Sequence, residues 1–188
     1  MDDTIPLREL RTDFRNGSTN SMPFAGMVVW GVLSIAALFL DLRTTSTAAL
    51  YIMMAILPLA WLLDRLRGRN LFASNGNPLE KLFLSSIVGI AVTIPAIVIG
   101  ASGGQPTLIV LGMAILAGVI WIPYGWAADD PTGIRHAVGR AIGAYAAYGF
   151  APDALKATAI CAVVVLAYLY SLLQMRTTGR PVPASSAS

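Results

Sequence analysis

Charged side chains are scarce in this sequence of 188 residues: only 12% are Asp, Glu, Lys or Arg, whereas 56% are hydrophobic. A soluble domain of this size carries about 25% charged residues, so too few are present here to cover a water-exposed surface. The composition therefore argues against an ordinary soluble domain. It predicts one domain, an all-α bundle embedded in a membrane.

Cysteine and histidine each occur only once, as Cys161 and His136. One cysteine cannot form an intramolecular disulfide, and one Cys with one His lacks the ligand spacing of a zinc site. A single histidine also excludes haem held by two histidines. Because Cys161 lies in an apolar run, we expect it to be buried and inert, and we expect no cofactor and no metal.

Recognisable catalytic patterns are missing as well. The sequence has no G-x-S-x-G elbow, no H-E-x-x-H and no Gly-rich phosphate loop that ends in Lys-Ser or Lys-Thr. Ion-driven transporters usually place an ionisable residue near the bilayer centre, and the clear apolar runs have none in their middle. The sequence therefore leans away from an enzyme and gives no direct sign of an ion-driven pump.

What the chain does contain is a series of apolar runs of about 20 residues, which is the length that crosses a hydrocarbon core about 30 Å thick. Gly and Pro in the segment 102–106 divide one very long run into a hairpin of two spans. The predicted spans of this kind are residues 24–40, 44–63, 82–101, 107–128 and 157–175. The first begins without a signal-peptide cleavage pattern, so we expect an anchor.

A sixth span is predicted between Pro131 and Phe150. Its first half carries Arg135, His136 and Arg140, which makes it the least apolar of the six. Gly139 and Gly143 lie one turn apart, and small residues at this spacing let helices approach closely in lipid. We therefore interpret this segment as a span buried against its neighbours.

The placement of basic residues supports six spans with both termini in the cytoplasm. Of the 13 Lys and Arg residues, this topology leaves only Arg43 and Lys156 outside, so 13 − 2 = 11 lie inside. A topology with five spans would place ten basic residues inside and three outside. The positive-inside rule favours the larger asymmetry. We expect a bacterial inner-membrane location.

The two ends of the chain differ from the membrane domain, which we place at residues 22–176. Within residues 1–21, Leu7, Leu10 and Phe14 recur at helical spacing beside three arginines, which predicts a short helix in the cytoplasmic interface. A disordered polar tail is the alternative, because so short a helix is marginal alone. Residues 177–188 are predicted to form a flexible cytoplasmic tail.

One group of side chains could carry chemistry at the cytoplasmic face. The ends of the second and fourth spans and the start of the fifth meet at one depth, and His136 and Arg140 share a helix face. Arg140 would hold an anionic group, His136 would exchange protons, and the acids would orient them or hold Mg²⁺. The plainer interpretation is an aromatic belt, a helix cap and snorkelling arginines. The candidate pocket consists of Asp64, Tyr124, Asp129, Asp130, His136 and Arg140.

Several short pieces together resemble a group of small, uncharacterised bacterial membrane proteins of about this length. These pieces are residues 7–14, Met22-Pro23-Phe24 with Trp30, Pro58, Asn77-Pro78-Leu79, Pro95, and Pro123-Tyr124 near Trp126. The resemblance covers most of the chain and implies the same architecture. It implies no activity and no site residue.

Three functional classes remain open. A non-enzymatic accessory or scaffold protein is favoured, since nothing polar is committed to the bilayer centre of the clear spans. A channel or transporter for a small or lipophilic solute would use the proline-bearing second, third and fourth spans. An enzyme or headgroup binder would use the cytoplasmic pocket. Expected partners are the bilayer and its anionic headgroups, with a homo-oligomer or a membrane partner protein open, and no nucleic acid.

Overall fold

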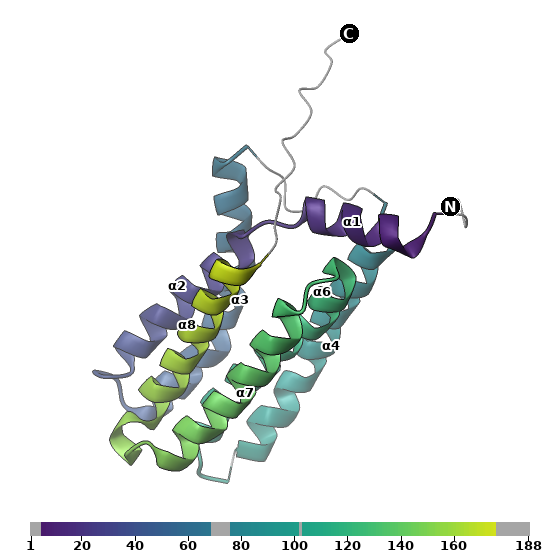
Figure 1. Ribbon diagram of the computed structural model, residues 1–188. Helices are drawn as coiled ribbons and strands as arrows, with labels where there is room; N and C mark the ends of the chain where they lie inside the picture. Colours follow the sequence, from purple (N-terminus) through teal and green to yellow (C-terminus); the bar gives the residue numbers. More distant parts are fainter. Residues whose placement is uncertain (1–4, 69–75, 102, 176–188) are drawn as a thin grey trace.

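All regular elements in the described part of the chain are helices (Figure 1). The computed structural model describes residues 5–68, 76–101 and 103–175. The α-helices are α1 (Leu7–Gly17), α2 (Ser21–Ala36), α3 (Leu42–Leu66), α4 (Pro78–Ala101), α5 (Thr107–Val119), α6 (Trp121–Ala128), α7 (Thr132–Phe150) and α8 (Lys156–Gln174). A short 3-10 turn, Asp153–Leu155, precedes α8. The predicted all-α class is confirmed, whereas the predicted tail at 177–188 lies outside the described residues.

Local sequence signals account for where the helices begin. The Asp41 carboxylate accepts a hydrogen bond from the backbone N–H of Thr44 (3.0 Å), which caps α3. The side-chain oxygen of Asn77 accepts a hydrogen bond from the backbone N–H of Leu79 (3.0 Å) at the start of α4. α4 and α5 are separated by a short segment that includes Gly103, Gly104 and Pro106, and they pack against each other, so the predicted division of the long apolar run into two helices is confirmed.

The run 107–128 is interrupted once. α5 ends at Val119 and α6 begins at Trp121, although the two together are still long enough to cross a membrane. Pro123 explains the interruption, because it has no N–H for the carbonyl of Val119 and its ring crowds that turn. Pro58 and Pro95, by contrast, lie within the uninterrupted helices α3 and α4.

The helices lie side by side, and α1 lies across one end of the bundle (Figure 1). At this end, which we call the α1 end, Asp64 near the end of α3 accepts a hydrogen bond from Ser21 at the start of α2 (2.5 Å). At the opposite end, the Ser46 hydroxyl near the start of α3 donates to the carbonyl of Pro106 before α5 (2.8 Å). α2 and α3 therefore run in opposite directions, whereas α3 and α5 run in the same direction.

Close packing concentrates around α8, which contacts α2, α5 and α7. A Cβ atom at Gly26 of α2 would overlap the ring of Tyr168 on α8, and one at Gly143 of α7 would lie 2.7 Å from the Val163 side chain. These glycines let helix backbones approach closely, as small residues do in membrane bundles. Helix α4 is the opposite case, since Leu79 and Ala101 are its only buried residues.

Four helical segments are long and apolar enough to cross a membrane, and a fifth is formed if α1 and α2, which are bent by 51°, count as one. The four segments are α3, α4, α5 with α6, and α8 with its preceding turn. α7 is not among them; it carries Arg135, His136 and Arg140. The described chain is therefore compatible with a membrane protein that crosses the bilayer several times.

Candidate functional site

Helix α1 is anchored to the end of the bundle by apolar and polar contacts. Phe14 is buried, and its ring packs with Phe83 of α4 and Tyr124 of α6, with ring centroids about 6 Å apart. The Asn77 side-chain amide donates to the carbonyl of Leu10 (2.8 Å), which ties α1 to the start of α4. The stripe that includes Leu10 and Phe14 therefore packs on protein.

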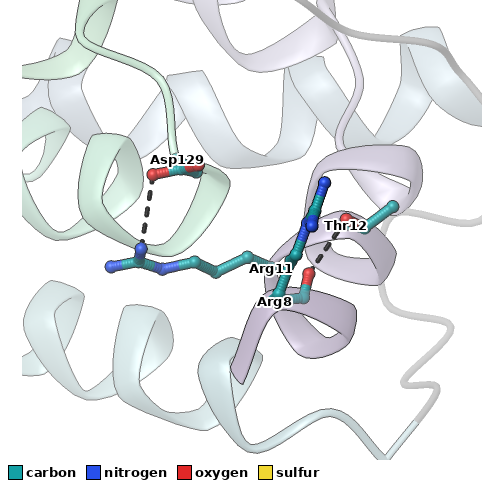
Figure 2. A network of polar contacts seen from close by, with 4 residues as sticks. All are labelled: Arg8, Arg11, Thr12 and Asp129. Carbon is teal, nitrogen blue, oxygen red and sulfur yellow. Dashed lines mark hydrogen bonds and ion pairs between the residues drawn. The ribbon is translucent and has the colours of Figure 1, made fainter. Parts of the chain in front are cut away.

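The arginine face of α1 makes one ion pair with the bundle (Figure 2). Arg11 Nη1 lies 3.3 Å from Asp129 Oδ1, and its guanidinium lies 4.7 Å from the centre of the Trp126 ring. Arg8, Arg11 and Arg15 line one cleft together with Asp129. Three positive charges and one negative charge therefore surround a single hollow at the surface.

An apolar cavity of about 240 Å³, which we call the lateral pocket, lies under α1 between α3 and α4. These two helices each pack against α5 but barely touch each other. The polar lining residues Ser18, Thr19, Glu80 and Lys81 belong to the α1 end of the bundle. The apolar lining includes Ile56, Leu57, Phe83, Leu84, Ile87, Ile120, Trp121 and Tyr168.

Asp64 lies beside this pocket in a network of hydroxyl groups. Its carboxylate accepts hydrogen bonds from Ser21 (2.5 Å) and from Thr19 (3.0 Å), and Arg67 donates to the Ser21 hydroxyl (3.2 Å). Asp64 and Ser21 are fully buried. Because each buried polar group here has a partner, the network fixes the end of α3 against the start of α2.

His136 and Arg140 lie in the bundle interior, and each is only 1% exposed. The His136 ring stacks on Trp121 at 4.3 Å and meets Tyr168 edge to face at 5.1 Å. Its Nδ1 is 2.7 Å from the hydroxyl of Ser171, and its Nε2 is 3.5 Å from Arg140 Nη1. Aromatic rings and Ser171 thus surround His136, and it makes no ion pair with an acid of the described residues.

The contact with Arg140 favours one tautomer of His136. Arg140 can only donate, so an interaction with its Nη1 requires a lone pair on Nε2, which places the proton of the neutral ring on Nδ1. Nδ1 then donates to Ser171, which is the reverse of the arrangement in which a histidine takes a proton from a serine nucleophile. In this geometry the pair orients Arg140 and does not activate Ser171.

The six predicted site residues fall into separate contact groups. Asp129 pairs with Arg11, and Asp130 accepts the N–H of Thr132 (2.9 Å) at the start of α7. Asp64 bonds to the hydroxyls of α2 and the segment before it. A row of contacts joins the other three, because Tyr124 packs on Trp121 (5.4 Å), Trp121 on His136, and His136 approaches Arg140.

Three residues around Arg140 did not emerge from the sequence as site residues. Trp30 of α2 and Tyr168 of α8 place their rings 5.5 and 5.2 Å from the Arg140 guanidinium carbon, and Ser171 contacts His136. Tyr168 and Ser171 are three residues apart and so share one face of α8. That spacing could have indicated from the sequence that the two residues act together, whereas nothing local in the sequence marks Trp30.

The described residues contain no group of three His, Cys, Asp or Glu side chains placed to hold a metal ion. Cys161 is free and buried, as its apolar run predicts. The chemistry that the described site offers is therefore a buried guanidinium among aromatic rings, next to a pocket with apolar walls.

The described helices define an all-α class of protein with four segments able to cross a membrane by length and composition. A model of a family of unknown function, DUF7010, matches residues 7–176, and the chain belongs to this family. The expected membership of an uncharacterised family is thereby confirmed. No curated protein and no solved structure gives a significant match.

Proposed function

We propose that this chain is a multi-pass membrane protein that binds a lipophilic or amphiphilic molecule in the lateral pocket. The observation that carries the proposal is the separation of α3 from α4, which leaves an apolar cavity of about 240 Å³ beside helices able to cross a membrane. Ligand pockets in proteins are mostly apolar concavities with a few polar groups that orient the ligand. The polar groups here are at the α1 end, where an amphiphile would place its head.

The position of the pocket favours a ligand that arrives from the bilayer. Leu57 of α3 and Leu84 of α4 both line it, and both are at least 36% exposed on the surface of the bundle. The pocket is also lined by α3, α4 and the α5–α6 segment, the proline-bearing spans that would form the path of a transporter. We therefore rank a lipophile-binding or lipophile-transporting protein above an accessory protein without a ligand.

Tryptophan quenching by lipids with brominated acyl chains tests the pocket, since bromine quenches on contact. In a variant with Trp61 and Trp126 replaced by Phe, the remaining tryptophans are Trp30, which is fully buried, and Trp121, which lines the pocket. We expect brominated lipid to quench Trp121. Ile87→Phe, which fills the pocket, should reduce the quenching, whereas Val88→Phe on the exposed face of α4 should not. Equal quenching in the two variants would contradict the proposal.

Flux measurements then separate transport from binding. Uptake of a lipophilic dye into proteoliposomes should depend on the protein if the pocket is part of a path, and Ile87→Phe should lower it. Binding without flux would favour an accessory protein that senses or holds a lipid. Protein-dependent flux and binding without flux are both consistent with a ligand in the lateral pocket. If neither flux nor binding is found, the proposal is rejected.

We further propose six crossings with the α1 end in the cytoplasm, in an inner membrane. The residues just before α2 and just after α8, Thr19 and Met175, line the same pocket, which supports an even number of passes. α7 would be the pass shielded from lipid by its neighbours. Of the described basic residues, only Arg43 and Lys156 belong to the other end of the bundle. An impermeant thiol reagent should label Asp153→Cys only when it is added outside, and Thr12→Cys only when it has access to the inside. The reverse pattern would reject this orientation.

A second candidate function is supported by the cleft on α1. Arg8, Arg11 and Arg15 outnumber Asp129 there, and arginine-rich interfacial helices attract anionic headgroups. Replacing Arg8 and Arg15 by Gln spares the Arg11 ion pair. With the purified protein in detergent, we expect that double variant to bind a short-chain anionic lipid less tightly than the parent. Arg43→Gln combined with Lys156→Gln, at the opposite end of the bundle, should have no effect. Unchanged binding in the α1 variant would remove this candidate.

A further inference from the structure

Arg140 combines deep burial with unused hydrogen-bond donors. Within the described residues, Nε and Nη2 of Arg140 have no hydrogen-bond partner and no acid lies within ion-pairing distance, although the side chain is 1% exposed. A guanidinium cannot lose its charge as an amine can, so neutralisation does not relieve its burial. Burying a charge is costly unless it is paired, and cation–π contacts to Trp30 and Tyr168 offset only part of that cost.

The unused donors have a particular geometry. Nη1 is directed to His136, and Nε and Nη2 form the remaining side edge of the guanidinium plane. Two parallel N–H groups on one edge match the two oxygens of a carboxylate, which is why arginine binds carboxylates in a bidentate manner. A spherical ion such as chloride offers the two donors only one shared acceptor. The free edge therefore favours an oxyanion with two oxygens, such as a carboxylate.

A third donor adds to this cluster. Within the described residues, the indole Nε1 of Trp30 also has no partner, and Trp30 is fully buried with its ring against the guanidinium. Buried Trp N–H groups usually find an acceptor. Two side chains with unpaired donors, one on α2 and one on α7, are therefore in contact in the bundle interior.

We propose that Arg140 and Trp30 form a buried site for a carboxylate in the interior of the bundle. His136 orients the guanidinium through Nη1 and leaves its side edge free. Tyr168 both lines the lateral pocket and lies against the guanidinium, so one ring separates the two sites. The carboxylate can belong to a small soluble acid or to the head of an amphiphile with its tail in the pocket. Only the second source rests on the proposed function.

Thermal unfolding of the purified full chain in detergent tests the site with three sodium salts at equal ionic strength: chloride, acetate and octanoate. We expect acetate or octanoate to raise the unfolding midpoint above that in chloride. Arg140→Lys keeps the charge but loses the bidentate edge, so it should abolish the difference. Arg135→Gln, which removes an exposed charge from the same helix, should leave it unchanged. Equal midpoints in the three salts would overturn the proposal.

Two further variants separate the possible outcomes. Trp30→Phe keeps the ring and removes only the N–H, so it should weaken carboxylate binding about tenfold, as expected for one hydrogen bond to a charged group. A Trp30→Phe variant that binds as tightly as the parent would remove Trp30 from the site. If Ile87→Phe blocks octanoate but not acetate, the amphiphile uses the lateral pocket. If Ile87→Phe changes the effect of neither salt, the carboxylate site is supported and its ligand is a small soluble acid.

Discussion

The contact between α6 and α7 depends on a pair of glycines. A Cβ atom at Gly133 would overlap the carbonyl oxygen of Trp121 and lie 2.6 Å from the Cα of Gly125. These are backbone atoms, so no side-chain rotation can relieve the overlap. We therefore predict that Gly133→Ala pushes the two helices apart.

The expected magnitude follows from two opposing effects. Inserting a methyl group into a filled space costs about 1–3 kcal/mol, and replacing glycine by alanine within a helix returns up to about 1 kcal/mol. A net loss of about 0–2 kcal/mol in the free energy of unfolding corresponds to a midpoint lower by up to about 8 °C for a chain of this size. Gly139→Ala is the matched control on the same helix, because a Cβ atom added at Gly139 has no neighbouring atom within 4 Å.

Thermal unfolding in detergent, followed by tryptophan fluorescence, measures both variants against the parent. We expect Gly139→Ala to unfold at the parent temperature or slightly above it, and Gly133→Ala below it. If Gly133→Ala is as stable as Gly139→Ala, the close contact of α6 and α7 does not exist in the protein.

Two other changes give independent tests. Asp64→Leu leaves the Ser21 hydroxyl without its acceptor in a buried position, which should lower the free energy of unfolding by about 1–3 kcal/mol in a chemical denaturation series. The hydroxyl and N–H of Thr44 hold the pKa of Asp41 below its ordinary 3.8. A lowered folded-state pKa stabilises the protein above the unfolded pKa and loses that effect as the pH falls, so Asp41→Asn should flatten the loss of stability below about pH 4. An unaltered acid profile would contradict this assignment.

The positions of the helices could be read from the sequence because they depend on local features. Runs of apolar residues, the Pro and Gly in segment 102–106, and the caps at Asn77 and Asp130 all act within a few residues. Asp130 illustrates the limit of such reasoning. It accepts the N–H of Thr132 as a cap would, yet α7 begins one residue later than the Asp-Pro pair predicts.

The site depends on which helix faces meet, and the sequence does not state this. The spacing of Gly139 and Gly143 predicts that both allow close helix packing. Of these two glycines, only Gly143 has a close neighbour, which is the Val163 side chain. The tightest approach is at Gly133, which has no special pattern around it. In the same way, Trp121 contacts both Tyr124 and His136. This arrangement depends on α6 packing against α7, which the sequence alone does not show.

Helix α4 has a consequence for how the protein would respond to its surroundings. Its apolar part, residues 82–101, is 20 residues long and at about 1.5 Å per residue covers about 30 Å, which matches a hydrocarbon core of about 30 Å. In the proposed membrane topology, a thinner bilayer would leave this span too long, and such a span adjusts by tilting. Because α4 buries few residues, its neighbours would oppose that tilt only weakly. The width of the gap between α3 and α4 should then change with the thickness of the bilayer, and with it the access of lipids to the lateral pocket.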